Sequence, residues 1–139
     1  GNAIRLCANT GARLHLIKPL GFDLEDKQLR RAGLDYHEYA TLQVHESLQA
    51  ALAMIAPQRL FALSTRGTQR YDQPRYRDGD AFLFGPETRG LPTDVLDNLP
   101  PEQRLRLPMR PGNRSLNLSN SIAVVVFEAW RQMDFAGGA

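Results

Sequence analysis

The segment R-S-L-N-L-S-N-S-I-A-V-V-V-F-E-A-W, residues 114–130, joins small polar side chains to the most apolar block of the chain. Ser and Asn favour helix N-termini, where a side-chain oxygen accepts from an unpaired backbone N–H group. Apolar residues then recur at helical spacing, at Leu118, Ile122, Val125 and Ala129. Other large apolar residues fall outside that stripe, so this helix is apolar nearly all round. Such a helix lies deep in a core or faces a partner subunit.

The polar residues of this segment outnumber what one helix cap needs. They are Ser115, Asn117, Ser119 and Asn120. A loop that leads into a helix N-terminus presents free backbone N–H groups, which suit a small ligand. We therefore expect this segment to line a ligand site.

Short apolar strands alternate with helical segments along the rest of the chain. Strands are predicted at 14–17, 59–65, 81–84 and 104–107, and helices at 2–8, 24–32, 46–56 and 92–99. Residues 66–79 read as a polar loop. This alternation predicts a single α/β domain over residues 1–139, with a mostly parallel sheet flanked by helices.

Three loops follow predicted strands and carry unusual sequences, at residues 63–67, 84–92 and 107–120. Ligands in parallel α/β sheets bind at the carboxyl ends of the strands. The polar segment described above belongs to the third loop, so we expect the three loops to form one binding pocket.

Composition limits the class of protein. The chain of 139 residues has one cysteine, Cys7, which excludes an internal disulfide and agrees with a cytoplasmic setting. No apolar run approaches the roughly 20 residues that span a bilayer, and no signal peptide opens the sequence. The net charge is only +2, but 15 of the 17 basic residues are arginine, which suits phosphate recognition. Genomic base composition would also explain that arginine bias.

Common catalytic motifs are missing or incomplete. Gly85 and Gly90 resemble a phosphate-binding loop, but Leu91-Pro92 stand where Lys-Ser/Thr would follow. No G-x-G-x-x-G is present. The three histidines lack metal-ligand spacing, so no metal is expected. Ser115 has no evident His and acid partner for hydrolase chemistry.

Several stretches together resemble the SPOUT class of RNA methyltransferases. They are N-A-I-R-L-C-A-N-T-G at 2–11, F-G-P-E-T-R-G-L-P at 84–92, L-P-M at 107–109, and R-S-L-N-L-S-N with V-V-V-F-E-A-W at 114–130. The stretch D-K-Q-L-R-R-A-G-L-D-Y-H-E at 26–38 is similar as well. The resemblance covers essentially the whole chain and is closest to enzymes that methylate the ribose 2′-hydroxyl of the wobble nucleotide, cytidine or uridine, in leucine tRNA.

The resemblance implies a deep trefoil knot near the C-terminus, an exception to the rule that chains do not thread. It also implies S-adenosylmethionine as cofactor, with S-adenosylhomocysteine as product. The partners would be a tRNA anticodon loop and a second copy of the chain, bound through the first and last helices. The family normally begins with a further strand and a P-P-N-T-G-N loop, whereas this sequence begins at Gly1-Asn2. We expect that strand to have been trimmed from the sequence.

The same resemblance assigns roles to individual residues. Catalysis would involve Arg5, Glu87 and Asn117, with Arg5 engaging the RNA backbone or the ribose hydroxyl. Gly85 would let the backbone approach the cofactor. The other residues expected to bind the cofactor are Leu63, Thr65, Leu107, Met109, Ser115 and Leu116.

Weaker candidates for tRNA contact lie in the 66–77 segment, where arginines and tyrosines interleave. They are Arg70, Tyr71, Arg75 and Tyr76. A solvated surface loop would look the same. Two alternatives to the wobble-nucleotide activity remain open: 2′-O-methylation of another tRNA or ribosomal RNA site, and a non-catalytic knotted protein that binds RNA or assists assembly.

Overall fold

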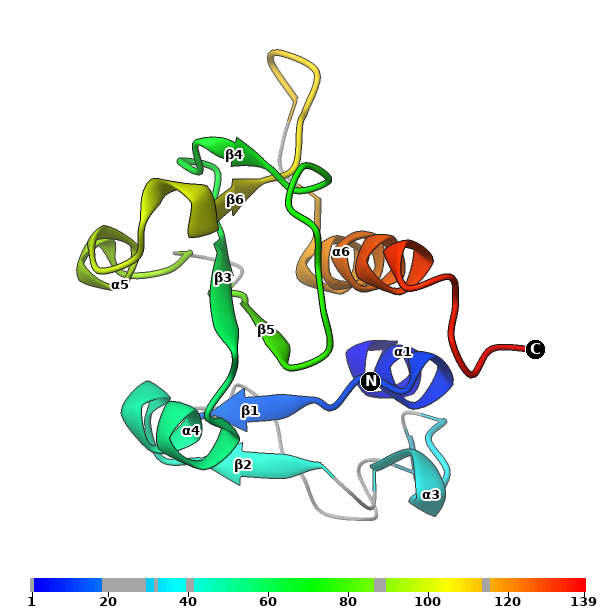
Figure 1. Cartoon of the computed structure of the whole chain (residues 1–139). Helices are drawn as coiled ribbons and strands as arrows, with labels where there is room; N and C mark the ends of the chain where they lie inside the picture. Colours follow the sequence, from blue (N-terminus) through cyan, green and yellow to red (C-terminus); the bar gives the residue numbers. More distant parts are fainter. Residues whose placement is uncertain (1, 19–29, 32, 40–41, 87–89, 114–115) are drawn as a thin grey trace. The chain divides into compact units, whose positions relative to one another are not determined.

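The strands in the described part of the chain pair in parallel, as the alternation of strands and helices predicts. The computed structural model describes residues 2–18, 30–31, 33–39, 42–86, 90–113 and 116–139 (Figure 1). The chain divides into two units, residues 1–56 and residues 57–139. Each unit is described by itself below.

The first unit holds a pair of short strands and three described helices. They follow the order α1 (Asn2–Thr10), β1 (His15–Ile17), α3 (Tyr36–Tyr39), β2 (Gln43–His45) and α4 (Leu48–Ile55). Ile4 of α1 and Leu34 form the buried centre of one cluster, with Leu14 and Leu42 packed against them. This cluster ties α1 to the segment that leads into α3.

The second unit contains a parallel sheet whose strand order is β4-β6-β3-β5. In chain order its elements are β3 (Arg59–Leu63), β4 (Gln69–Arg70), β5 (Asp80–Leu83), α5 (Thr93–Asp97), the 3₁₀ helix η1 (Pro101–Gln103), β6 (Arg104–Arg106) and α6 (Leu118–Gln132). The apolar segment that follows the Ser/Asn-rich stretch thus forms α6, the longest described helix of this unit.

Helices cover both faces of this sheet. Successive side chains of a strand point to opposite faces, so neighbouring apolar residues of β3 pack against different helices. Phe61 of β3 packs in one buried cluster with Ala129 of α6. The next residue, Ala62, packs in another cluster with Leu96 of α5. Figure 1 shows α5 and α6 on opposite sides of β3. A sheet buried on both faces is the arrangement that the apolar strands predict.

Residues 64–68 cross from one side of β6 to the other. Leu63 of β3 pairs with Leu105, and Gln69 of β4 pairs with the same residue from the opposite side. The crossing is tight at Gly67, where an added Cβ would lie 2.3 Å from the carbonyl oxygen of Leu105. Only glycine fits a backbone that passes so close to a strand.

The structure corrects several details of the predicted elements. Strand β4 lies within 66–79, which was predicted to be a polar loop, and α3, β2 and η1 were not predicted. Helix α1 continues two residues beyond Ala8, to Thr10. The predicted helix at 24–32 lies almost wholly outside the described residues.

Candidate active site

A pocket of about 550 Å³ opens where the ends of β3, β5 and β6 meet the N-terminus of α6. Its volume is in the range of small-molecule sites, roughly 300–1,000 Å³. The lining residues come from all three strand-end loops and from the start of α6: Leu63, Ser64, Thr65, Arg66, Phe84, Gly85, Pro86, Gly90, Leu91, Leu107, Met109, Leu116, Asn117, Leu118 and Ser121. The structure therefore brings together the loops that the sequence predicted to meet.

Most residues predicted to bind the cofactor line this pocket. Leu63, Thr65, Gly85, Leu107, Met109 and Leu116 do so, as does the predicted catalytic residue Asn117. Glu87 and Ser115 lie outside the described residues. Ser64, Arg66 and Ser121 also line the pocket and were not predicted.

The polar segment before α6 supplies one cap. Asn117 is the N-cap residue, and its Oδ1 accepts a hydrogen bond from the backbone N–H of Asn120 at 2.9 Å. Its carbonyl oxygen accepts from the N–H of Ser121 at 3.0 Å. Because Asn117 and Ser121 both line the pocket, the cap also fixes the pocket wall that α6 contributes.

Gly85 is required by packing within its own loop. A Cβ at this position would lie 2.4 Å from the carbonyl carbon of Gly90 and 2.5 Å from the nitrogen of Leu91. Gly90 N–H also donates to the carbonyl of Pro86 at 2.9 Å. The sequence suggested that Gly85 allows close approach of a ligand, and the structure adds that it allows close approach of the backbone at Gly90 and Leu91.

The turn that follows β3, residues 64–67, forms one wall of the pocket and is hydrogen-bonded to β6. Ser64 N–H donates to the carbonyl of Leu105 at 2.9 Å. The hydroxyl of Ser64 accepts from the N–H of Arg66 at 3.0 Å, and its carbonyl accepts from Gly67. This turn places Leu63 and Thr65 in the pocket lining.

Two apolar side chains of the pocket remain open to solvent. Met109 is 38% exposed and Leu116 is 42% exposed. Apolar lining with a few polar groups is typical of sites that hold a flat, partly apolar ligand.

Arg5 lies on α1, in the first unit. Its Nε donates to Glu38 Oε2 at 3.0 Å, and its Nη2 donates to the carbonyl of Gly33. The sequence singled out Arg5 without revealing these partners.

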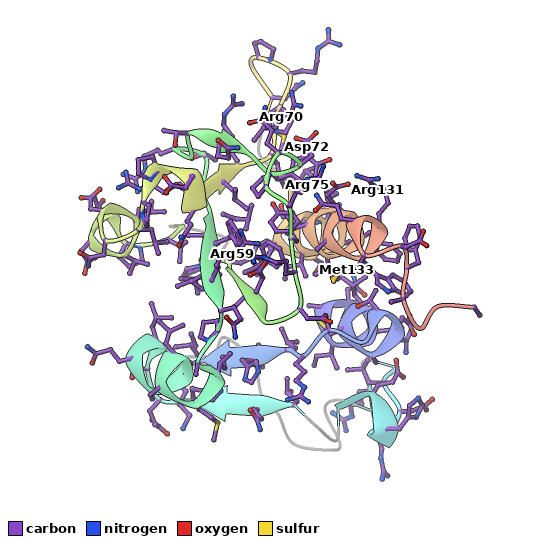
Figure 2. All side chains as sticks on the ribbon, in the orientation of Figure 1. Arg59, Arg70, Asp72, Arg75, Arg131 and Met133 are labelled. Atoms are coloured by element: carbon purple, nitrogen blue, oxygen red, sulfur yellow. The ribbon has the colours of Figure 1, made fainter. Side chains whose placement is uncertain are left out.

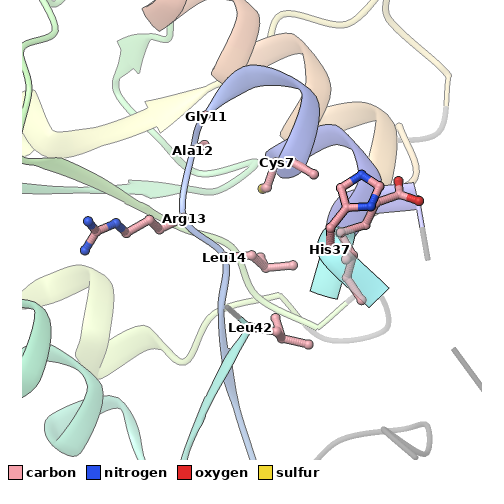
Figure 3. A pocket seen from close by; sticks show the side chains of 10 residues that line it. Cys7, Gly11, Ala12, Arg13, Leu14, His37 and Leu42 are labelled. Atoms are coloured by element: carbon pink, nitrogen blue, oxygen red, sulfur yellow. The ribbon is translucent and has the colours of Figure 1, made fainter. Parts of the chain in front are cut away.

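The first unit also contains a smaller pocket of about 270 Å³ beside α1 (Figure 3). Cys7, Arg13 and His37 are among its lining residues. Burial raises the pKa of the Cys7 thiol, so it stays protonated near neutral pH. A protonated, buried thiol is a poor nucleophile, so Cys7 is not proposed as a reactive residue.

The candidate RNA-contact residues separate into exposed and buried ones. Arg70 pairs with Asp72, and Arg75 is exposed nearby, on the side of the unit where Arg131 also lies (Figure 2). Tyr76 is only 5% exposed, and its hydroxyl donates to the carbonyl of Tyr71. Its ring packs edge-on against two phenylalanines of the core. The structure thus makes Tyr76 a core residue with no free face for stacking on a base.

Neither a metal centre nor a membrane span is found among the described residues. No group of three or more His, Cys, Asp or Glu side chains in the described ranges is placed to hold a metal ion. None of the helices in that part of the chain is long and apolar enough to cross a bilayer.

The chain is similar to proteins of one methyltransferase family. The model of the SpoU rRNA methylase family matches residues 1–127. The tRNA (cytidine(34)-2′-O)-methyltransferase of Methylovorus glucosotrophus is 66% identical over 137 residues, which cover 99% of this chain and 89% of that protein.

Two solved structures extend the likeness to the fold. A Bacillus anthracis protein proposed to be an RNA methyltransferase has a TM-score of 0.90 and 39% identity, over 99% of this chain and 87% of that one. A structure from work on the 2-OH methylation of C/U34 on tRNA has a TM-score of 0.83 and 45% identity, over 96% of this chain and 81% of that one. The α/β fold is therefore shared with these proteins.

Proposed function

The chain belongs to the SpoU rRNA methylase family, and from that premise we propose that it methylates the ribose 2′-hydroxyl of the wobble nucleotide, cytidine or uridine 34, in leucine tRNA. The relative from Methylovorus glucosotrophus, whose name states tRNA cytidine 34, supports this target. The finer assignment to leucine tRNA rests on the sequence resemblance alone.

The pocket at the strand ends is the observation that carries the proposal. We assign it to S-adenosylmethionine, which supplies an electrophilic methyl group and leaves as S-adenosylhomocysteine. The exposed apolar surfaces of Met109 and Leu116 suit an adenine ring. Leu63, Thr65, Gly85 and Leu107 complete the described binding residues, and Ser115 remains a proposed one.

The chain's own residues position the reactants and stabilise charge. A neutral ribose hydroxyl is a weak nucleophile, so its orientation and partial loss of its proton dominate the barrier. A guanidinium carries a positive charge, so the role that we propose for Arg5 is to stabilise negative charge that develops on the oxygen or to hold the adjacent phosphate. Asn117 supports the reacting region from the cap of α6, and Glu87 stays a proposed catalytic residue.

The surroundings of the site suggest its macromolecular partners. Arg70, Tyr71 and Arg75 are proposed to contact the anticodon loop, whose unstacked bases suit arginine and aromatic side chains. We propose a homodimer through α1 and α6, because Val124 and Phe127 leave an apolar face of α6 exposed. We also propose that the protein is a cytoplasmic enzyme with the trefoil knot of its class. The crossing of β6 by residues 64–68 supports the knot.

The proposed function is tested by methyl transfer from labelled S-adenosylmethionine to bulk tRNA and, in parallel, to ribosomal RNA. Digestion of the tRNA followed by mass spectrometry should identify 2′-O-methylcytidine and 2′-O-methyluridine at position 34 of leucine isoacceptors. Label in ribosomal RNA or at another tRNA position would replace the proposed target. Cofactor binding without any transfer would favour a non-catalytic RNA-binding protein.

A further inference from the structure

Arg5 is held by two acceptors, one on α3 and one on the segment that leads into this helix. Its Nε donates to Glu38 Oε2 at 3.0 Å, and its Nη2 donates to the carbonyl of Gly33. The Arg5 side chain is 50% exposed, whereas that of Glu38 is 9% exposed. An exposed arginine is thus held by a largely covered carboxylate.

Glu38 is itself fixed by the start of its helix. Its Oε1 accepts from the backbone N–H of Asp35 at 2.8 Å, while the backbone N–H of Glu38 donates to the carbonyl of Asp35 at 2.9 Å. Asp35 precedes the first residue of α3 and Glu38 is the third, which is the glutamate half of a capping box. Each carboxylate oxygen therefore has its own donor. These contacts lower the pKa of Glu38, the Asp35 N–H first and then Arg5, so the carboxylate stays charged at neutral pH.

The base of this arrangement is buried. Ile4, next to Arg5, packs with Leu34, next to Gly33, in the apolar cluster of the first unit. The backbones that carry the arginine and its carbonyl acceptor are therefore tied together. The two contacts engage Nε and Nη2, so they fix the plane of the guanidinium at two points.

An ion pair whose arginine is half exposed adds little to stability, because solvent screens it and long side chains lose entropy on pairing. Its effect on orientation is larger, because an unheld arginine samples many rotamers and must be ordered again for each substrate. A fixed guanidinium has already lost that freedom before the RNA arrives.

We propose that Glu38 is a positioning residue, which together with the Gly33 carbonyl aims the guanidinium of Arg5 at the RNA ribose–phosphate group. The proposal rests on the function assigned to Arg5 above. Glu38 does not touch the substrate and acts only through Arg5.

A double-mutant cycle tests this assignment. Steady-state methylation of tRNA is measured for Arg5→Ala, Glu38→Ala and the double variant. Glu38→Ala is expected to lower kcat about 10- to 100-fold, the scale of misplacing a catalytic group by about 1 Å, with a smaller change in KM for tRNA. In the Arg5→Ala background the same change should have no further effect on kcat. Losses that multiply in the double variant would overturn the proposal, as would an unchanged kcat in Glu38→Ala.

A second variant and a matched control separate positioning from folding. Glu38→Gln leaves only one acceptor oxygen for the two donors, so one contact is lost while the shape is kept; its kcat should fall between those of the wild type and Glu38→Ala. Glu46→Gln removes the carboxylate paired with Lys18 at 2.9 Å in the same unit and should leave kcat unchanged. Every variant is expected to bind S-adenosylmethionine with wild-type affinity.

A contact readout distinguishes failure of this inference from failure of the proposed function. The exchange of the Arg5 Nε–H with solvent, followed by ¹⁵N nuclear magnetic resonance, should be slow in the wild type and fast in Glu38→Ala. Equal exchange rates would overturn the positioning role even if tRNA is methylated. A wild-type protein that methylates no RNA but shows the difference would refute the proposed function and leave the contact established.

Discussion

Replacing Gly85 by alanine should weaken cofactor binding while the fold survives. The added Cβ would lie 2.4 Å from Gly90 C and 2.5 Å from Leu91 N, about 1 Å inside ordinary van der Waals contact. Both neighbours are backbone atoms, so the backbone at residue 85 or at residues 90–91 must move by about that distance. Overpacking of this kind costs about 1–3 kcal/mol, and the movement displaces one wall of the pocket.

Isothermal titration calorimetry with S-adenosylhomocysteine and thermal unfolding measure the two effects of Gly85→Ala. The dissociation constant should rise by at least about 10-fold, equivalent to 1.4 kcal/mol, and Tm should fall by roughly 3–10 °C. Gly79→Ala is the matched control, because Gly79 precedes β5 at the other end of the strand and has a φ of 92°. It should lower Tm and leave the dissociation constant unchanged. Wild-type affinity in Gly85→Ala would refute the reasoning.

Three further predictions concern the cap, the arginine and a histidine pair. Asn117→Ala should lower the free energy of unfolding by about 1 kcal/mol in urea titrations, whereas Asn117→Asp, which keeps an acceptor, should not. Arg5→Ala should retain cofactor affinity and lose about 10²-fold in single-turnover methyl transfer; unchanged turnover would remove Arg5 from the site. Burial lowers the pKa of His15, helped by His45 and Arg13. The imidazole of His15 therefore binds a proton at higher pH in the unfolded chain than in the folded protein, and the free energy of unfolding should fall as the pH drops below 6.5. Urea titrations at pH 5 and 7.5 measure this fall, which His15→Gln should make smaller.

The pocket was predictable because its signals are local. A strand end is marked by its apolar run and a helix start by its Ser and Asn residues, so a cap within residues 115–120 and a pocket loop at 84–92 follow from short stretches. The structure identifies Asn117 as the residue that forms the cap. The parallel topology then requires the strand ends to meet at one edge. The structure adds the polar residues Ser64 and Arg66, which owe their places to a turn held by Leu105.

The features that sequence reasoning missed depend on long-range packing. Tyr76 was grouped with exposed arginines because its neighbours in sequence are polar. Its ring centroid nevertheless lies 5.2 Å from that of Phe61 and 4.9 Å from that of Phe82. The need for Gly67 likewise arises only when β6 passes beneath it. The contact of Arg5 with Glu38 joins residues 33 positions apart in the sequence, and no periodic pattern predicts a contact over that separation.

The most direct test is a crystal structure of the protein with S-adenosylhomocysteine at saturating concentration. Electron density for the ligand is expected between the 63–66, 84–91 and 107–109 loops and the start of α6, with its adenine against Met109 or Leu116. Ligand density at another place would contradict the assignment of this pocket to the methyl donor. An empty pocket in crystals grown with saturating ligand would contradict it as well.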